Sequence, residues 1–425
     1  MLQTNKYINR IKSILPQLVE WINLLSTIYL IASLILSFQY QQLAIYIYFT
    51  SLLFDIIINQ RYKNVKWHKA KWTFIVMIIF YLCIWIWHIF ESCQSNAFFH
   101  STDIRLPFIA FGILGIFFNL NPKIKISHIA TTMLIATLTA TTYIIYKKYD
   151  SFFSPDITIN HIRTILPEIR QELLHVTHIE FNLYINCTMA LCFICYNECN
   201  KKIIKTLFAI GTIFTYIILF INEGRSGFIT ANILFVLFII FYIYKNKPKL
   251  LIPSIIVFSF IFLLPITTHD RLKFDYLEDD PRLTIWNLSF EMIKEKPLFG
   301  YGVCNGKELF IQQITNNPNF DSFWEFWSTL YPKYDKNRFH NHNAFLESAI
   351  EFGLIGLIIT ILIFILPILL TQHKKRLYLT IFILIFSIQA IFESFTYHYQ
   401  ILLFCWIIYF FINIKLLDDN KHHSM

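Results

Sequence analysis

The sequence has few charged residues for its length. Only 15% of its 425 residues are Asp, Glu, Lys or Arg, whereas 56% are hydrophobic and 18% are aromatic. Soluble globular proteins contain roughly 25% charged residues, so this chain lacks the charge that several hydrated domains would need. The composition excludes an ordinary soluble protein and predicts that most of the chain lies in a bilayer.

Cysteine frameworks and metal-binding patterns are also missing. The eight cysteines are scattered, and most lie in apolar segments, including Cys192, Cys195 and Cys199 on one helical face. Cysteines in such segments pack as small hydrophobic residues. Only Cys304 lies well inside a long polar segment, and the chain has no Asp-x-Asp step. We therefore expect no disulfide framework, no metal ion and no other cofactor.

Long apolar runs dominate what is present. A membrane-spanning helix needs about 20 mostly apolar residues, and twelve runs with little or no charge approach that length. They cover residues 18–38, 43–59, 72–90, 105–120, 126–146, 179–197, 203–221, 227–244, 250–267, 343–370, 377–392 and 400–414. Pro367 predicts a local break near the end of the longest run. The sequence thus predicts an all-α polytopic membrane protein with about 12 transmembrane helices.

The basic excess fits this topology. The formal net charge is +9, from 36 Lys and Arg against 27 Asp and Glu. With the N-terminus in the cytoplasm, most Lys and Arg of the short loops lie on the inner side, as the positive-inside rule requires. We therefore predict that both termini are cytoplasmic and that the chain binds a bilayer and no nucleic acid. The first apolar run is as long as a full span and is expected to remain as a helix.

Two outer segments, 147–178 and 268–341, are too long to be simple connections. The second contains most of the side chains capable of chemistry. Within it, residues 281–296 have helical spacing, and we expect Leu283, Trp286, Phe290 and Ile293 to form its apolar face. We expect one transmembrane domain over residues 1–425, with 268–341 inserted as an outer loop. Function is expected where this loop meets the outer ends of the helices.

Two arginines interrupt the apolar pattern on that side. Arg225 lies in the polar break Asn222-Glu-Gly-Arg-Ser-Gly227, and Arg282 begins the predicted loop helix. Arg225 can reach the interface or pair with Glu223, and Arg282 can be a solvated surface charge. Alternatively, the two guanidinium groups can bind phosphate oxygens as a pair. Sequence spacing leaves both readings open.

Two histidines, His340 and His342, immediately precede the long apolar run 343–370, and Glu347 and Glu351 follow on one helical face. Carboxylates at this depth usually face a cavity. The histidines can be simple helix-end residues. The start of a helix also favours neutral imidazole, which can act as a general base near neutral pH.

Taken in order, these segments resemble the O-antigen ligase and polymerase superfamily of bacterial inner-membrane glycosyltransferases. The resemblance covers the whole GT-C-like topology, with its large periplasmic loop between the ninth and tenth helices. Its most specific parts are Arg225, Arg282 with Trp286, the turn Pro297 to Gly302, the step His340-Asn-His342-Asn343, and Glu351-Phe-Gly353 with Gly356.

The resemblance, with the ligase branch favoured, implies transfer of a polysaccharide from undecaprenyl pyrophosphate to a sugar hydroxyl of lipid A–core oligosaccharide, in lipopolysaccharide biosynthesis. It implies that Arg225 and Arg282 hold the pyrophosphate. His342 is then the general base, although His340 is not excluded from that role, and His340, Asn343 and Glu347 support the site. The implied reaction is an inverting displacement without a metal, at a periplasmic site in the inner membrane.

Three alternatives remain open at this stage. A polysaccharide polymerase and a protein O-oligosaccharyltransferase use the same donor with different acceptors. A transporter of lipid-linked sugars would use the arginines to bind pyrophosphate without bond cleavage. The sugar, the linkage, the acceptor and the oligomeric state are not readable from the sequence.

Overall fold

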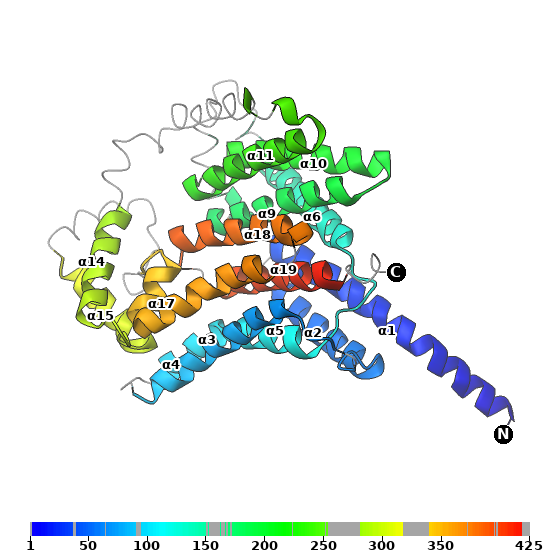
Figure 1. Ribbon diagram of the computed structural model, residues 1–425, viewed down its shortest axis with the longest axis horizontal. Coiled ribbons are helices and arrows are strands. Elements are labelled where there is room, and N and C mark those ends of the chain that lie inside the picture. The colour runs from blue at the N-terminus through cyan, green and yellow to red at the C-terminus, as the bar shows by residue number, and fades with distance from the viewer. Residues whose placement is uncertain are drawn as a thin grey trace.

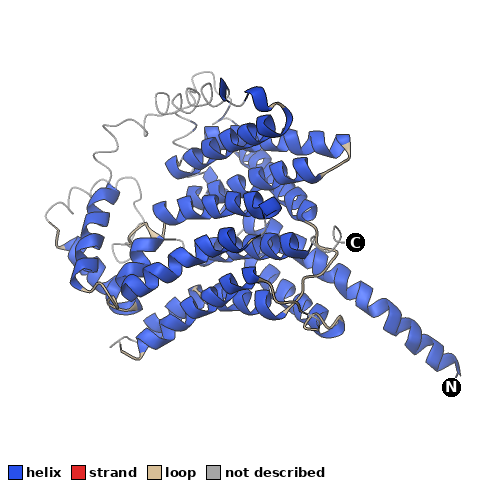
Figure 2. Cartoon of the chain, in the orientation of Figure 1, coloured by secondary structure: helices blue, strands red, loops and turns tan. Residues whose placement is uncertain are grey.

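The computed structural model describes most of the chain as a bundle of helices. The described residues are 2–36, 40–63, 65–90, 95–149, 152, 162, 166, 169–170, 172–222, 224–250, 252–253, 281–317, 340–371, 373–394, 396 and 398–418. Within them every regular element is a helix (Figure 2). The all-α prediction is therefore confirmed for this part of the chain.

Eight described helices are long and apolar enough to span a membrane. The helices with these spans are α1 (Leu2–Leu36), α2 (Gln41–Ile58), α3 (Trp72–His88), α6 (Ile126–Lys147), α9 (His178–Glu198), α10 (Lys202–Ile221), α11 (Arg225–Asn246) and α17 (Ala344–Leu370). Three further predicted spans fall on α5 (Leu106–Phe117), α18 (His373–Phe392) and α19 (Tyr399–Asp418), whose fully described apolar parts have only 10–17 residues. The remaining predicted span, 250–267, lies almost wholly outside the described residues, so the predicted total of 12 stays a prediction.

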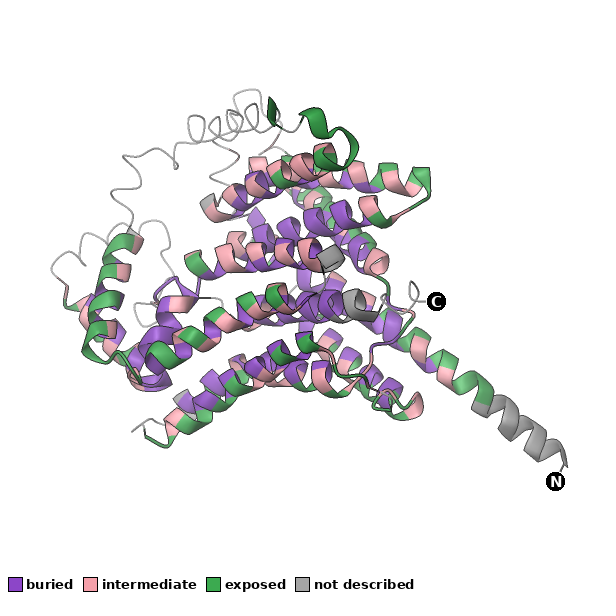
Figure 3. Cartoon of the chain, viewed as in Figure 1, coloured by how far each residue is buried: buried purple, intermediate pink, exposed green. Residues whose placement is uncertain are grey.

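The centre of the bundle consists of α9 and α19. Every residue from Glu180 to Cys195 in α9 is buried, and so is every residue of α19 from 401 to 413. Exposed apolar residues instead lie on outward faces of peripheral helices, where lipid replaces water as the solvent (Figure 3). Cys192 and Cys195 of α9 are free and buried, so they pack as small apolar side chains, as predicted.

Cys304 departs from the predicted pattern. It lies in α15 (Val303–Thr315) and is disulfide-bonded. The sequence predicted no disulfide framework, and this single disulfide-bonded cysteine was not anticipated. The prediction relied on the spacing of cysteines along the chain, which does not reveal which ones meet in space.

The loop helices lie together at one end of the bundle. The helices α14 (Pro281–Glu295) and α15 pack beside the start of α17, whereas the start of α1 and the end of α19 lie at the opposite end (Figure 1). The short helix α4 (Ser95–Ile104) also reaches α15. Residues 281–317 therefore cover the end of the bundle where α17 begins.

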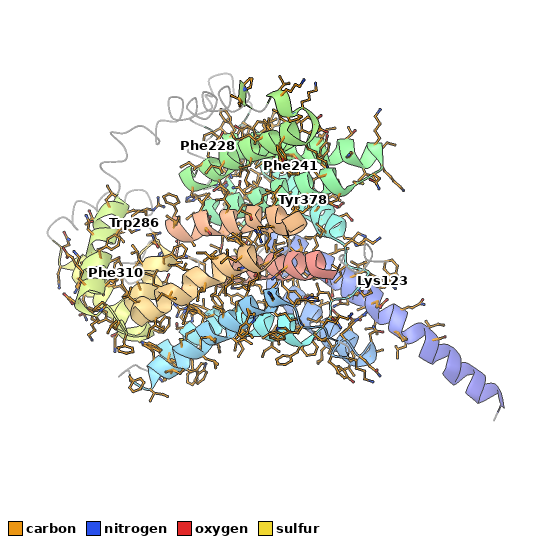
Figure 4. All side chains as sticks on the ribbon, in the orientation of Figure 1. Lys123, Phe228, Phe241, Trp286, Phe310 and Tyr378 are labelled. Atoms are coloured by element: carbon orange, nitrogen blue, oxygen red, sulfur yellow. The ribbon has the colours of Figure 1, made fainter. Side chains whose placement is uncertain are left out.

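The helical prediction for residues 281–296 is confirmed. Its predicted apolar face is right for Trp286 and Ile293, which are partly buried against this cluster, and wrong for Leu283 and Phe290. Ile285, Leu288 and Met292 form the buried face, packed with Phe310 of α15 and Ile350 of α17. Leu283 and Phe290 are instead about half exposed, at 46% and 50%. Two apolar series with helical spacing coexist in this segment, and only the position of α15 and α17 decides which one is covered. Figure 4 shows Trp286 and Phe310 on these neighbouring helices.

A break in α17 receives the turn that follows α14. Gly353 has a φ of 64° and a ψ of −154°, which interrupts the helix there rather than near Pro367 as predicted. The carbonyl groups of Ile350 and Glu351 accept hydrogen bonds of 2.8 Å from the backbone N–H groups of Tyr301 and Gly302. The N–H of Leu354 in turn donates to the Pro297 carbonyl at 2.8 Å. The turn therefore satisfies backbone groups that the broken helix cannot pair internally.

Candidate active site

The two predicted histidines lie at the start of α17. Asn343 caps this helix, because its side-chain oxygen accepts hydrogen bonds of 3.0 Å from the N–H groups of Phe345 and Leu346. His342 precedes the cap with a φ of 47°, a left-handed conformation uncommon outside glycine. The rings of His340 and His342 lie 4.0 Å apart between centroids, and His342 is only 6% exposed. The Asn343 cap and the left-handed backbone of His342 thus place both imidazoles at the start of α17.

A buried carboxylate, Glu393, lies between three histidines. Its Oε1 atom is 3.3 Å from Nδ1 of His342, 3.5 Å from Nε2 of His340 and 3.5 Å from Nε2 of His398. Glu393 follows α18, and His398 immediately precedes α19. A carboxylate can only accept, so the contact with His342 favours a proton on Nδ1 and makes Nε2 the basic nitrogen.

The protonation states of Glu393, His340 and His398 depend on their burial and on their contacts with neighbouring side chains. Burial opposes ionisation of Glu393. The charge interaction with His342 and the hydrogen bonds that His342 and His398 donate outweigh burial, and they hold the pKa of Glu393 well below its usual range. Burial and the neighbouring His342 keep the pKa of His340 well below the ordinary value. Burial lowers the pKa of His398, but the hydrogen bond to Glu393 outweighs it and raises that pKa. Glu393 is therefore an anion and His340 a neutral imidazole near neutral pH.

Glu347 and Glu351, the predicted carboxylates of α17, meet a buried arginine. Arg105, between α4 and α5, is 1% exposed. Its Nη2 lies 2.8 Å from both oxygens of Glu351 and 3.3 Å from Oε1 of Glu347. Breaking a buried ion pair by removing one partner costs about 3–5 kcal/mol. Arg105 therefore ties the junction of α4 and α5 to the start of α17.

Arg282 belongs to a helix that is bonded to the histidine segment. It lies in the first turn of α14 and is half-buried. One turn later, the indole Nε1 of Trp286 donates a 3.1 Å hydrogen bond to the carbonyl of Asn341. The structure thus places the predicted phosphate-binding helix directly against the predicted base.

Arg225 begins α11, in a turn held by α9. Asn222 donates to Oδ1 of Asn182 at 2.6 Å, and the Asn186 amide donates to the Gly227 carbonyl at 3.1 Å. A Cβ on Gly227 would lie 2.5 Å from the Asn182 side chain, so the turn and α9 are in close contact. The side chains of Arg225 and Glu223 lie outside the described residues. Their pairing, and a clamp of Arg225 with Arg282, stay predictions.

Arg170, from the segment between α6 and α9, supports the same turn. It is fully buried, donates a 2.6 Å hydrogen bond from Nη1 to Oδ1 of Asn222, and lies 5.2 Å from the ring of Phe181. The start of α9 also approaches the histidine cluster, because Glu180 is close enough to His398 to contribute to the rise in its pKa. The polar turn before α11 and the histidines therefore belong to the same end of the bundle.

Sequence reasoning missed four polar residues of this end of the bundle. They are Arg105, Arg170, Glu393 and His398. A usable signal existed for two of them, because Arg105 and Glu393 are charged residues at the boundaries of apolar runs, where a charge is expensive unless it has a function or a partner. What the sequence could not supply was the partner, which in each case comes from a distant helix.

Comparison with known proteins gives one finding on family. Residues 210–361 match the family model described as O-Antigen ligase, whereas the search of curated proteins finds no match. The matched segment contains Arg225, Arg282, both histidines of the pair and Glu347, but Arg105 and Glu393 lie outside it. Members of this family are glycosyltransferase-like enzymes. The match confirms the resemblance in the sequence: residues 210–361 are similar to the O-antigen ligase family.

Proposed function

We propose that the protein is an O-antigen ligase of the bacterial inner membrane. In this role it transfers a polysaccharide from undecaprenyl pyrophosphate to a sugar hydroxyl of lipid A–core oligosaccharide, without a metal ion. The family match supports ligase or polymerase chemistry. The single observation that carries the mechanism is the 3.3 Å contact between Nδ1 of His342 and the buried carboxylate of Glu393.

In the proposed reaction, His342 acts as the general base through Nε2. An acceptor hydroxyl loses its proton to Nε2 as its oxygen attacks the anomeric carbon of the donor. The bond from that carbon to the pyrophosphate oxygen breaks, and the bonding electrons leave with undecaprenyl pyrophosphate. Attack opposite the leaving group inverts the anomeric centre. Glu393 stabilises the imidazolium that forms and keeps the proton of Nδ1 in place.

The arginines are assigned to the leaving group. Arg282 and Arg225 would bind the pyrophosphate oxygens and offset the charge that develops on them, which preorganised cations do well in a site with little water. The hydrogen bond between Trp286 and Asn341 supports this assignment for Arg282, since it holds α14 beside the histidines. For Arg225 the support is its position at the start of α11, because its side chain lies outside the described residues.

The periplasmic placement of the site has separate support. Cys304 of α15 is disulfide-bonded and lies in the helix that packs against the start of α17. Disulfides persist in oxidising compartments such as the periplasm and are rare in the cytosol. An outward-facing site with both termini on the cytoplasmic side fits this chemistry and the distribution of basic residues.

The test is genetic complementation of a strain that lacks this gene. Wild-type protein should restore capped lipopolysaccharide, whereas H342A, R282A and R225A should reach the membrane at normal levels without restoring it. Strains carrying the inactive variants should accumulate lipid-linked polymer and bare core. Single repeat units on the core would instead identify a polymerase, and capping by all three variants would refute the assignment.

A further inference from the structure

Two basic connections lie at the end of the bundle opposite the histidines. They are residues 59–71, between α2 and α3, and residues 118–125, between α5 and α6. The helix α3 begins at the first connection, and its other end reaches the docked turn, where the rings of Trp87 and Phe299 lie 6.2 Å apart. Together the two connections contain seven Lys and Arg and no Asp or Glu. The proposed reaction uses none of these residues.

The two connections are joined to each other and to α5. The backbone N–H of Asn119 donates to the Arg61 carbonyl at 3.0 Å, and its side-chain amide donates to the Lys63 carbonyl at 3.2 Å. Nζ of the buried Lys71 donates to the carbonyl of Ile116 at 2.7 Å. Basic residues that are distant in sequence therefore share one surface.

The acidic residues in contact with these connections are used internally. Arg61 lies 2.6 Å from Glu20 of α1 and 3.1 Å from the buried Asp55 of α2, and Lys123 lies 3.2 Å from Glu20. Four other lysines are exposed instead, and we call them the basic surface: Lys63, Lys66, Lys69 and Lys125. The exposed charge of the two connections is therefore positive.

Two tryptophans lie among these lysines. Trp67 and Trp72 are 55% and 51% exposed, and their rings pack edge to face, 6.1 Å apart between centroids. A half-exposed indole is unfavourable in water but suits the headgroup region of a bilayer, which offers both apolar and polar contacts. Lysines at the membrane surface attract anionic headgroups. The indoles and the lysines thus point to the same kind of partner.

We propose that the basic surface binds an anionic phospholipid, with the lysines on its headgroup phosphate and the indoles of Trp67 and Trp72 beside its glycerol backbone. With both termini in the cytoplasm, this lipid belongs to the inner leaflet. A soluble anion would gain nothing from the indoles. A zwitterionic phospholipid carries a cation that the lysines repel, so the surface should select for negative charge.

The test is lipid titration of purified full-length protein, with bound lipids counted by native mass spectrometry. The probes are phosphatidylglycerol and phosphatidylcholine with the same acyl chains. Wild-type protein should bind phosphatidylglycerol about tenfold or more tightly than phosphatidylcholine. Equal binding of the two lipids, or displacement of phosphatidylglycerol by an equal concentration of inorganic phosphate, would overturn the proposal.

The variant Trp67→Ala tests the indole while keeping every lysine that orients the chain in the bilayer. Its affinity for phosphatidylglycerol should fall about fivefold. Trp85→Ala is the matched control, because Trp85 is a half-exposed residue near the other end of α3, and its affinity should stay within about twofold of wild type. Equal affinities of the two variants would contradict a role for the indole.

The triple variant K63Q/K66Q/K69Q tests the charge. Its affinity for phosphatidylglycerol should fall about tenfold or more, whereas that for phosphatidylcholine should not change. An unchanged affinity for phosphatidylglycerol would overturn the proposal.

The control for the charge variant is K201Q/K202Q/K205Q, which removes the same number of lysines around the start of α10. It should bind phosphatidylglycerol as the wild type does. Equal losses in the two triple variants would show that the lipid responds only to net charge at this end of the bundle, which would also overturn the proposal. None of these measurements depends on transfer activity, so the proposed function can fail without affecting this surface.

Discussion

The indole of Trp286 donates a 3.1 Å hydrogen bond to the carbonyl of Asn341. This bond joins the helix that carries Arg282 to the backbone between the two histidines. Residues that are 55 positions apart in sequence are thereby held at one site. This bond therefore holds the helix that is proposed to bind phosphate beside the proposed base.

The variant Trp286→Phe should test the contribution of this bond. Phenylalanine retains an aromatic ring near Phe392 and removes the N–H donor together with part of the indole. A single hydrogen bond contributes about 1 kcal/mol, so we expect transfer activity to fall about fivefold in a reconstituted assay. Trp72→Phe, at the exposed start of α3, is the control. Equal activity of the two variants would show that the bond does not position Arg282.

The variant Glu393→Gln should identify the orienting role of the carboxylate. Gln fills the same space but can present an N–H to Nδ1 of His342, which favours the wrong tautomer. We expect kcat to fall by about 10²-fold or more, with changed pH dependence and little change in the donor KM. Glu393→Asp should recover part of the rate.

Glu198→Gln is the control for that experiment, because Glu198 bonds Tyr378 at the opposite end of α9. A loss of activity explained entirely by lower protein abundance would argue for a structural role of Glu393. The same fall in kcat at every pH, with no rescue by Asp, would argue against an orienting role.

The variant Gly353→Ala should disrupt the docked turn. Gly353 has a positive φ, and a Cβ there would collide with the backbone of Leu298. The collision and the left-handed conformation together should lower the free energy of unfolding by about 3 kcal/mol. Lower melting temperature and lower membrane abundance are the expected readouts. Gly211→Ala is the control, because its Cβ would first meet the flexible end of Leu134; equal melting temperatures would refute the docking role.

The stability of the histidine cluster should depend on pH through His398 and Glu393. The pKa of His398 is raised from 6.5 in the folded protein, so its contribution is fully present below pH 6.5 and is lost as pH rises through the raised value. The pKa of Glu393 is lowered from 4.5, so its contribution is present above pH 4.5 and is lost as pH falls through the lowered value.

The difference in melting temperature between the wild type and His398→Gln should therefore be largest from pH 4.5 to 6.5. It should shrink as the pH rises further, because His398 then loses its positive charge. Thermal unfolding of detergent-purified protein across pH 4 to 9 measures this difference. A difference that stays constant over that range would exclude the ion pair as its origin.

Much of the architecture followed from the sequence, for a direct physical reason. Apolar runs of about 20 residues have few stable arrangements other than helices across a bilayer, and eleven of the twelve predicted runs correspond to described helices. Asn343 and the histidines before it also stood out, since polar residues are rare beside such a run. Local composition thus determined the helices and the end of the bundle at which to seek the site.

Only the tertiary structure decided which residues complete that site. Glu393 reaches His342 from 51 positions away, and Arg105 reaches Glu351 from 246 positions away. The buried face of α14 and the break at Gly353 were likewise set by contacts with α15, α17 and the turn from Pro297 to Gly302. A periodic pattern specifies that a helix has an apolar face, but partners and buried charges are chosen by packing in three dimensions.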